Sequence, residues 1–165
     1  MNQAPLGYQP HNHERCINEA LTSARQLCQE KGARLTSIRE QVLTYVWLSH
    51  QPLGAYDILE HLSQHKNSTK LAPPTVYRAL DFLQEHGLVH RIASLNAYMG
   101  CCLPNLPHHS QFLICQHCRT TVELADQNIS QSVLKAASAS GFQVETEHIE
   151  ILGRCPNCQQ ESDRD

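Results

Sequence analysis

The chain has 165 residues, of which 41% are hydrophobic, which is enough for one ordinary domain or two small ones. It contains no run of about 18 apolar residues that would span a bilayer, and its N-terminus lacks the charged and then apolar layout of a signal peptide, so we expect a soluble, cytoplasmic protein. The formal net charge of −3 permits a nucleic-acid-binding surface in residues 1–92, which carry nine Lys and Arg against eight Asp and Glu, but it does not demand one.

A flexible arm and two helices are predicted first. Residues 1–13 mix Pro, Gly, Asn, Gln and His without a period, which is typical of a flexible segment. From Glu14 onward apolar residues recur at intervals of three and four, and Gly32 supplies a stop, which predicts the first helix. Thr36 can cap a second helix, and we expect the Pro52 and Gly54 pair to end it.

Two further helices follow. The apolar spacing predicts a third helix from Ala55 to about His65, and the polar run over residues 65–70 is then a loop. A fourth helix begins near Pro74, because the missing amide of proline costs nothing in a first turn. Gly87 fits the C-terminal cap of this helix.

A hairpin completes the first domain. The runs LVHRI and AYMGC resemble two short strands, joined by residues 93–96. Helices closed by such a hairpin describe a winged helix-turn-helix domain over residues 14–102. Residues 103–107 contain two prolines and break every period, so we expect a hinge there.

Residues 108–165 predict a second, small domain of mixed composition, which makes the chain α+β overall. QFLIC and TTVEL indicate strands on either side of a cysteine pair. Apolar residues from Ile129 to Ala137 then indicate a helix that ends at Gly141. The run FQVETEHIEIL is long enough for one extended strand.

Two cysteine pairs in this second domain are the strongest chemical pattern in the chain. The spacing Cys115-x2-Cys118 and Cys155-x2-Cys158 gives two knuckles that together supply four thiolates, a closed tetrahedral site for zinc. Cytosolic thiols are kept reduced, so paired cysteines in such a protein hold metal more often than they form disulfides. A closed site leaves no position for water or substrate, so we expect a structural zinc, with an iron–sulfur cluster or free redox cysteines as the lesser alternatives.

A second group of candidate ligands lies around the predicted domain junction. His90 falls in the first strand of the hairpin, Cys101 ends the second, His108 follows the hinge, and Glu123 lies in a later strand. One thiolate and one carboxylate would neutralise a divalent cation, and two imidazoles would complete four-coordination. The soft thiolate favours zinc over iron or manganese.

Alternatives remain open at this second site. Cys102 or His109 could replace its neighbour, and a lone histidine is more often a surface or core residue than a ligand. His148 with Glu145 and Glu147 could form a further site, although solvated strand residues are the favoured interpretation.

The fourth helix carries the candidate DNA-binding residues. In the run PPTVYRAL, Thr75, Tyr77 and Arg78 lie in the first turns, from which a recognition helix reads base edges. Arg78 could contact guanine with two hydrogen bonds, and Tyr77 could pack on a thymine methyl. Phosphate contacts are assigned to residues that flank the second helix, with ordinary solvated side chains as the alternative: Lys31, Arg34 and Arg39.

These motifs resemble the ferric uptake regulator superfamily, and within it the zinc uptake regulator branch. The resemblance covers roughly residues 14–160 and rests on RLTSIREQVL, AYDIL, PPTVYRALDFLQEHGLVHRI, the Asn96-Ala97-Tyr98 wing, and the two knuckles. The block PPTVYRALDFL is highly specific. Iron regulators carry a His-rich segment that is represented here only by PHHSQF, with no Asp after His109, which argues against iron or peroxide sensing.

The resemblance implies a zinc-responsive repressor of zinc uptake genes that binds palindromic double-stranded operator DNA as a homodimer. It implies a C-terminal α/β dimerisation domain with structural zinc on the cysteine quartet and a regulatory zinc at the hinge, two Zn²⁺ per chain. His90, Cys101, His108 and Glu123 fall on the positions of the regulatory ligands, and Tyr77 and Arg78 on the base-reading positions. The alternative within the family is an iron- or peroxide-responsive regulator.

Two other classes compete with this interpretation. A zinc hydrolase or redox enzyme is disfavoured because the sequence has no H-E-x-x-H run, no nucleophile elbow and no phosphate loop. We therefore expect no enzyme activity, no small-molecule substrate and no membrane partner. A zinc-ribbon module that binds only protein is the other alternative, which substitution of Tyr77 and Arg78 would separate from a DNA-binding protein.

Overall fold

The computed structural model describes residues 6–9, 12–64, 71–106, 108–124 and 126–162. The chain divides into two compact units, unit 1 over Met1–Asn105 and unit 2 over Leu106–Asp165. In the part of the chain that is described, no helix is long and apolar enough to cross a membrane. Three sequence predictions fall wholly or partly outside the described residues: the loop over 65–70, the arm at 1–5 and 10–11, and residue 107 of the hinge.

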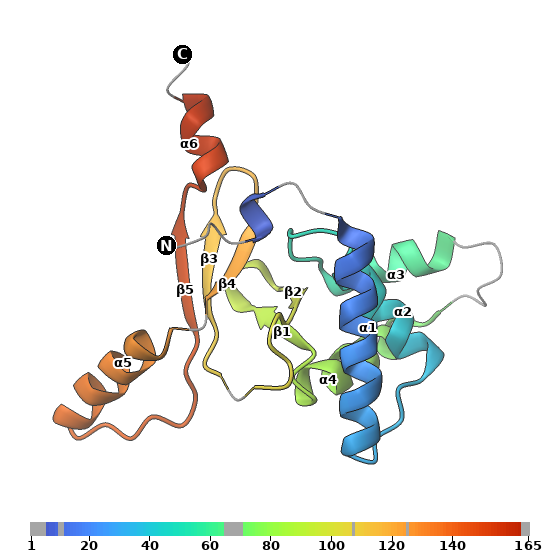
Figure 1. The fold of residues 1–165 in the computed structure, drawn as a ribbon, viewed down its shortest axis with the longest axis horizontal. Helices are drawn as coiled ribbons and strands as arrows, with labels where there is room; N and C mark the ends of the chain where they lie inside the picture. The colour runs from blue at the N-terminus through green and yellow to red at the C-terminus, as the bar shows by residue number, and fades with distance from the viewer. Residues whose placement is uncertain (1–5, 10–11, 65–70, 107, 125, 163–165) are drawn as a thin grey trace. The chain divides into compact units, whose positions relative to one another are not determined.

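The described residues of unit 1 form a short 3-10 helix followed by four α-helices (Figure 1). Their bounds are η1 Leu6–Tyr8, α1 His13–Glu30, α2 Ser37–Val46, α3 Ala55–Gln64 and α4 Pro73–Glu85. All four predicted α-helices are confirmed, with starts that differ from expectation by one residue at most. Helix α4 ends as predicted, because Gly87 adopts φ +70° and the Leu88 amide donates back to the Leu83 carbonyl.

Helix α2 differs from expectation in two respects. Thr36 occupies the N-cap position as predicted, but its side chain makes no capping hydrogen bond. The helix stops at Val46 instead of reaching Pro52, since the Trp47 amide tightens the last turn by donating to the carbonyls of Leu43 and Thr44. The residues after Trp47 are therefore not helical, and among them Leu53 forms an isolated antiparallel β-bridge with Tyr98.

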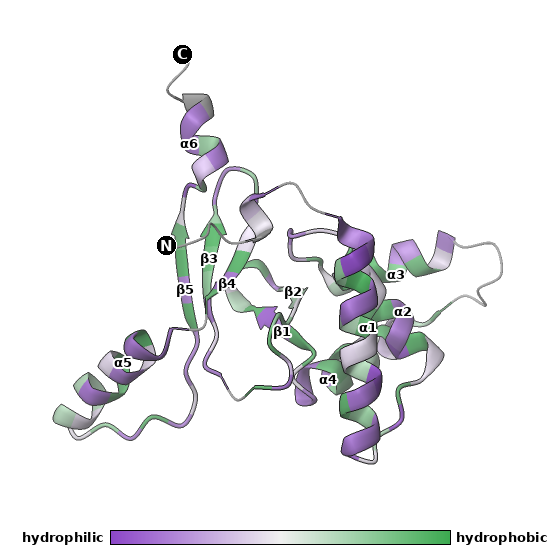
Figure 2. Ribbon diagram, in the orientation of Figure 1, coloured by the Kyte–Doolittle hydropathy of each residue, from purple (hydrophilic) through white to green (hydrophobic). Residues whose placement is uncertain are grey.

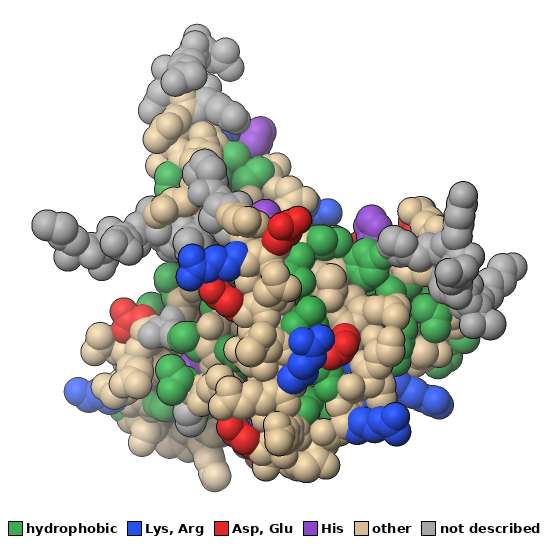
Figure 3. Space-filling view, turned by 45° about the vertical axis from the view of Figure 1, so that its right-hand side comes forward, with side chains coloured by type: hydrophobic (Ala, Val, Ile, Leu, Met, Phe, Trp, Pro, Cys, Tyr) green, Lys and Arg blue, Asp and Glu red, His purple; other side chains and the backbone are tan. Residues whose placement is uncertain are grey.

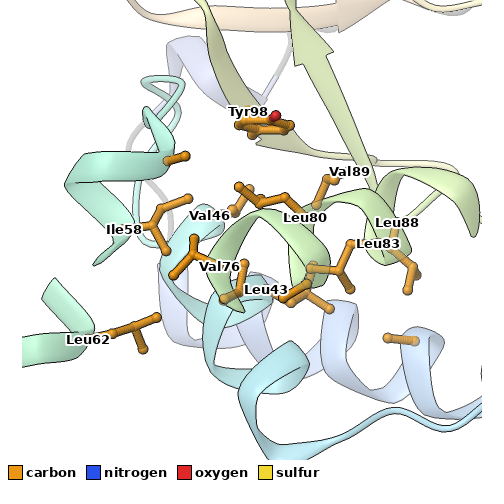
Figure 4. Close-up of a cluster of buried hydrophobic side chains, with 14 of the residues drawn as sticks. Leu43, Val46, Ile58, Leu62, Val76, Leu80, Leu83, Leu88, Val89 and Tyr98 are labelled. Carbon is orange, nitrogen blue, oxygen red and sulfur yellow. The ribbon is translucent and has the colours of Figure 1, made fainter. Parts of the chain in front are cut away.

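The core of unit 1 lies between these helices and the wing. Figure 4 shows Leu43 of α2 and Ile58 of α3 lying with Val76 and Leu80 of α4 in one apolar cluster, with Tyr98 covering it from the strand side. Leu80 and Ile58 are fully buried. Each fully buried side chain of this kind stabilises the folded state by about 1.5–3 kcal/mol, so packing alone can define the position of α4.

The wing is a two-stranded hairpin of β1 (Val89–Ile92) and β2 (Ala97–Gly100). The strands are antiparallel, with Val89 opposite Gly100 and His90 opposite Met99. The connection contains a 3-10 turn, η2 (Ala93–Leu95), and then Asn96 in the left-handed conformation. The predicted winged helix-turn-helix is thus confirmed.

Unit 2 contains a three-stranded sheet of mixed direction. Its elements are β3 Gln111–Cys115, β4 Thr121–Leu124, α5 Gln127–Ala139, β5 Ile149–Gly153 and α6 Pro156–Ser162. The strand order is β4-β3-β5, in which β3 pairs antiparallel with β4 and parallel with β5. Figure 2 shows mainly hydrophobic colouring along β3 and β5.

Sequence patterns describe the second half of unit 2 less well. The strand predicted over residues 142–152 is wrong for its first part, since only Ile149–Gly153 pairs with the sheet. Helix α6 was not predicted. Helix α5 forms where expected, with Asp126 capping its N-terminus, but it does not lie across the sheet (Figure 1), and of its residues only Ser130 is buried.

Candidate metal centres and nucleic-acid interface

The four cysteines of the two knuckles come together at one end of the sheet of unit 2. Cys115 ends β3 and Cys118 follows it in a tight turn, while Cys155 and Cys158 flank the start of α6. One sulfur from each residue lies within 4.8 Å of the others. The Sγ atoms of Cys118 and Cys155, from different knuckles, are 3.6 Å apart. The predicted quartet therefore forms one cluster in three dimensions.

Backbone amides favour the thiolate form of Cys115 in this cluster. Burial acts to raise the pKa of Cys115, but hydrogen bonds from the backbone of Cys118, Cys155 and His117 outweigh it and lower that pKa to about 6. The Cys155 amide, for example, donates to Cys115 Sγ over 3.4 Å. Burial and the neighbouring thiols raise the pKa of Cys158. Several thiolates so close together need a cation, which fits the four sulfurs to a tetrahedral metal site of the zinc type.

The two cysteines of the first helix of unit 1 differ in this respect. Cys16 and Cys28 lie in α1, and burial raises the pKa of both thiols. Neither belongs to a group of metal-ligating side chains among the described residues.

The wing of unit 1 carries two of the remaining predicted ligands on one face. The Cys101 amide donates to the Leu88 carbonyl over 3.0 Å, which extends the hairpin register by one pair. Cys101 thus lies opposite Leu88 and diagonally across from His90, so both side chains leave the same face of the hairpin. Cys101 is buried, and its Sγ accepts the Leu103 amide over 3.4 Å, whereas neighbouring Cys102 is exposed.

Unit 2 carries the other two predicted ligands as a hydrogen-bonded pair. His108 Nε2 lies 2.7 Å from Glu123 Oε1, and their side chains are 13% and 2% exposed. The other ring nitrogen, Nδ1, contacts the Leu106 carbonyl at 2.7 Å, which orients the imidazole so that Nε2 faces the carboxylate. The Ser110 hydroxyl donates to the same Glu123 oxygen over 2.6 Å. An imidazole and a carboxylate fixed in this way suit a divalent cation.

The further site considered around residue 148 does not form among the described residues. Glu145 and His148 are exposed, as expected for solvated residues. Glu147, in contrast, is 5% exposed at its side chain and accepts the Ser130 hydroxyl over 2.8 Å. Its other oxygen lies 4.0 Å from Nδ1 of His109, whose side chain is 62% exposed. Glu147 therefore joins α5 to the segment before β5.

The candidate recognition helix exposes the predicted residues. Val76 and Leu80 of α4 face the core, while Tyr77 and Arg78 point away from it and are exposed, and Thr75 is half-buried. Helix α4 has Pro73 and Pro74 in its first turn, and no side chain caps its N-terminus. The helix dipole and Arg78 give this end a positive character.

The three predicted phosphate-contacting residues have different environments. Lys31 and Arg34 are exposed near the start of α2. Arg39 is half-buried, with its guanidinium 3.5 Å from the centre of the Phe82 ring and hydrogen-bonded to the Arg34 carbonyl. Arg39 and Arg78 line one pocket of about 210 Å³ between α2 and α4. On the face drawn in Figure 3, the lysines and arginines are separated by other surface and form no continuous patch.

Tyr56 is a functional candidate that sequence reasoning missed. It lies in the first turn of α3, is 69% exposed, and meets the ring of Tyr77 edge to face at 6.4 Å. The two exposed aromatic rings thus lie side by side next to Arg78, where they could contact a base. The apolar spacing of α3 places Tyr56 away from the core face, which is the one feature of the sequence that indicates its exposure.

The chain is similar to a known protein family and to characterised relatives. A family model described as the ferric uptake regulator family matches residues 30–152. A zinc uptake regulation protein of Escherichia coli strain K12 is 37% identical over 141 residues, which are 85% of this chain and 81% of that protein.

Two solved structures are similar in both sequence and fold. A zinc uptake regulator complexed with zinc and DNA matches with a TM-score of 0.82 and 34% identity, over 89% of this chain and 97% of that one. The holo form of XcZur matches with a TM-score of 0.78 and 38% identity, over 87% of this chain and 99% of that one.

Proposed function

Because the chain belongs to the ferric uptake regulator family, we propose that it is a zinc-responsive transcriptional repressor of zinc uptake genes, which binds palindromic operator DNA as a homodimer in the cytoplasm. The observation that carries the proposal is within unit 1. An exposed recognition helix with Tyr77 and Arg78 shares this unit with a wing that presents an imidazole and a buried thiol, His90 and Cys101, on one face. The proposed activity is binding, with no small-molecule substrate.

The two zinc ions per chain have different proposed roles. Cys115, Cys118, Cys155 and Cys158 would hold the first, which stabilises unit 2. His90, Cys101, His108 and Glu123 would hold the second. A buried Cys101 beside an exposed Cys102, and a His108 whose Nε2 faces Glu123, support these residues over their neighbours.

Ligands contributed by both units would couple zinc to DNA binding. Two belong to unit 1 and two to unit 2, so the residues of the hinge over 103–107 would lose freedom when all four are engaged. A fixed orientation of the recognition helices matches two half-sites at a set spacing. Coupling of this kind is typically worth about 1–3 kcal/mol, and it is reciprocal, so DNA would also tighten zinc binding.

The proposed DNA contacts divide into two kinds. Arg78 and Tyr77, with Tyr56 beside them, would read bases in the major groove. Arg39, held by Phe82, and Lys31 and Arg34 would contact phosphates and set the register. Thr75 lies at the same end of α4 and would add a hydroxyl donor to a phosphate.

Unit 2 offers the surface for the proposed homodimer. Apolar side chains of α5, of β5 and of the segment between them are exposed, among them Leu134 at 38%, Leu152 at 51% and, between the two elements, Phe142 at 66%. Leu134 and Phe142 line an open pocket of about 410 Å³. Strand β5 is at an edge of the sheet. Monomeric proteins rarely leave an edge strand and a helix so uncovered, which supports a second copy as the partner.

The experiment that tests this function is operator binding with different metals. Protein that retains only the quartet metal would be titrated with Zn²⁺, Fe²⁺ and Mn²⁺ while its affinity for an operator fragment is measured. We expect zinc to restore tight binding at the lowest free concentration, because Cys101 supplies a soft ligand. Restoration by iron alone would favour the iron- or peroxide-responsive alternative, and no operator binding with any metal would reject a DNA-binding function.

A further inference from the structure

The only tryptophan of the chain packs against the wing from the face opposite the candidate ligands. Trp47 is the C-terminal cap of α2. A Cβ atom added at Gly100 would lie 2.2 Å from Cε2 of the Trp47 ring, which is closer than real Cβ contacts allow. Gly100 therefore permits the indole to touch the backbone of β2 directly, where any other residue would displace it.

The contact with Trp47 lies one residue before the candidate ligand Cys101 on its strand. Gly100 is opposite Val89, and these two residues directly precede Cys101 and His90 along their strands. Successive residues of a strand face opposite sides, so the indole contacts the backbone of β2 from behind the face that carries the thiol and the imidazole.

A second connection joins the same strand to the chain leaving α2. The Leu53 amide donates to the Tyr98 carbonyl over 2.9 Å, and the Tyr98 amide donates to the Leu53 carbonyl over 2.8 Å. Tyr98 and Gly100 are two residues apart and share a face of β2. Strand β2 thus contacts the ring of Trp47 at the end of α2, and two residues away it forms a backbone bridge with Leu53 of the segment that follows α2.

The indole is held by shape and not by a hydrogen bond. Its Nε1 atom is buried and has no hydrogen-bond partner among the described residues. Buried tryptophan N–H groups normally find an acceptor, because leaving the donor unpaired is costly. Packing against Gly100 outweighs that cost here, so the ring position depends on the close approach to β2.

Helix α2 links this contact to the DNA-binding surface. It packs against α4 through Val42, Leu43 and Val46, all fully or almost fully buried. A displacement of the wing would reach α4 through the same rigid helix, since close-packed elements transmit shifts instead of absorbing them.

We propose that Trp47 is a positioning residue that couples the zinc-ligand face of the wing to the recognition helix, through its contact with Gly100. The inference rests on the proposed function for the identity of the metal, and it concerns only residues of unit 1. It predicts that the position of the indole controls both the affinity of Cys101 and His90 for metal and the response of operator binding to that metal.

The test is a double-mutant cycle in the full chain with zinc retained on the quartet. The variants are Gly100→Ala, Trp47→Leu and the double variant, and Co²⁺ is the probe because its thiolate charge-transfer absorption reports ligation by Cys101. We expect Gly100→Ala to weaken Co²⁺ binding about tenfold and Trp47→Leu to weaken it less. The double variant should bind Co²⁺ as tightly as Trp47→Leu, because without the indole the alanine side chain at position 100 has no ring to displace.

Emission of the single tryptophan gives a readout without added metal. In Gly100→Ala the indole should emit at longer wavelength and be quenched more readily by acrylamide, since the ring is displaced toward water. If Gly100→Ala does not fold, Trp47→Phe and Trp47→Leu still test the proposal. Both should reduce the effect of zinc on operator binding, and Trp47→Leu, which has no ring, should reduce it more than Trp47→Phe.

Three outcomes would overturn the proposal. Additive effects in the cycle would mean that the alanine does not act through the indole. If the variants have a lowered melting temperature but unchanged Co²⁺ binding and an unchanged response to zinc, the contact is merely structural. Unaltered tryptophan emission in a folded Gly100→Ala variant would lead to the same conclusion. A wild-type chain whose operator binding ignores zinc would instead reject the proposed function, while the Co²⁺ cycle and the emission would still report on Trp47.

Discussion

Unit 1 buries a continuous cluster of apolar side chains from four helices and the wing, whereas unit 2 buries few. Among the described residues of unit 2, the buried aliphatic and aromatic side chains are Phe112, Ile114 and Val122. The rest of its buried set is polar or cysteine: Gln111, Thr121, Ser130, Cys115, Cys155 and Cys158. A domain with so small an apolar core needs another source of stability, and sulfur ligands and a partner surface are the two that this chain provides.

Loss of one quartet cysteine should produce the largest effect and should separate the two units. In Cys155→Ser we expect unit 2 to lose its cooperative structure, because structural zinc contributes on the order of 10 kcal/mol to such folds. Amide hydrogen exchange should show rapid exchange of β3, β4 and β5 while α2 and α4 remain protected. Cys16→Ser is the matched control, since Cys16 lies outside the quartet and should change neither unit. Protected strands in Cys155→Ser would show that packing alone stabilises unit 2.

The reverse experiment removes packing from unit 1. Leu80 is fully buried in the cluster of Figure 4, so Leu80→Ala should lower the free energy of unfolding of unit 1 by about 2–5 kcal/mol. Zinc bound to the quartet should be retained, as measured by metal analysis of the folded variant. Release of that zinc at denaturant concentrations that unfold only unit 1 would contradict the independence of the two units.

A change on the exposed side of the same helix should affect binding and leave stability alone. Arg78→Ala should cost about 1–3 kcal/mol of operator affinity, because a bidentate contact to a base is lost. The unfolding midpoint should shift little, since Arg78 is exposed. Arg15→Ala is the control, because Arg15 forms an exposed ion pair with Glu19 on α1 and should alter neither quantity. Equal losses of affinity in both variants would point to general electrostatics instead of base contacts.

Helix caps give the smallest effect and a direct comparison of the units. The Asp126 carboxylate accepts the Asn128 amide over 2.8 Å, so Asp126→Ala should destabilise unit 2 by about 1 kcal/mol. Thr36 makes no such bond, so Thr36→Ala should leave the stability of unit 1 nearly unchanged. Thermal unfolding of the two variants measures both, and a larger loss in Thr36→Ala would mean that the hydroxyl caps α2 in solution.

The sequence predicts most of unit 1 because its elements are encoded locally. Periodic apolar residues, Pro73 and Pro74, and Gly87 mark helix α4 without knowledge of its neighbours. The cysteine quartet is predicted for a similar reason, since a knuckle needs a fixed short spacing.

The errors occur where an element depends on partners distant in sequence. Residues 142–148 have the composition of a strand, but the sheet offers β3 as a partner only to Ile149–Gly153. The cap at Thr36 has the right residue type, but its hydroxyl makes no bond to the helix. The contact of Trp47 with Gly100 joins residues far apart in the chain and leaves no periodic pattern, so no sequence rule would find it.

In the proposed mechanism the first zinc stabilises unit 2 and the second switches DNA binding. The most direct test is native mass spectrometry of the protein with an operator fragment across buffered free zinc, which counts zinc per chain in the free and DNA-bound species. We expect DNA-bound dimers to carry two zinc ions per chain, whereas protein with one zinc per chain should remain mostly unbound. DNA-bound dimers with one zinc per chain, at the same affinity, would contradict it and would remove His90, Cys101, His108 and Glu123 from the switch.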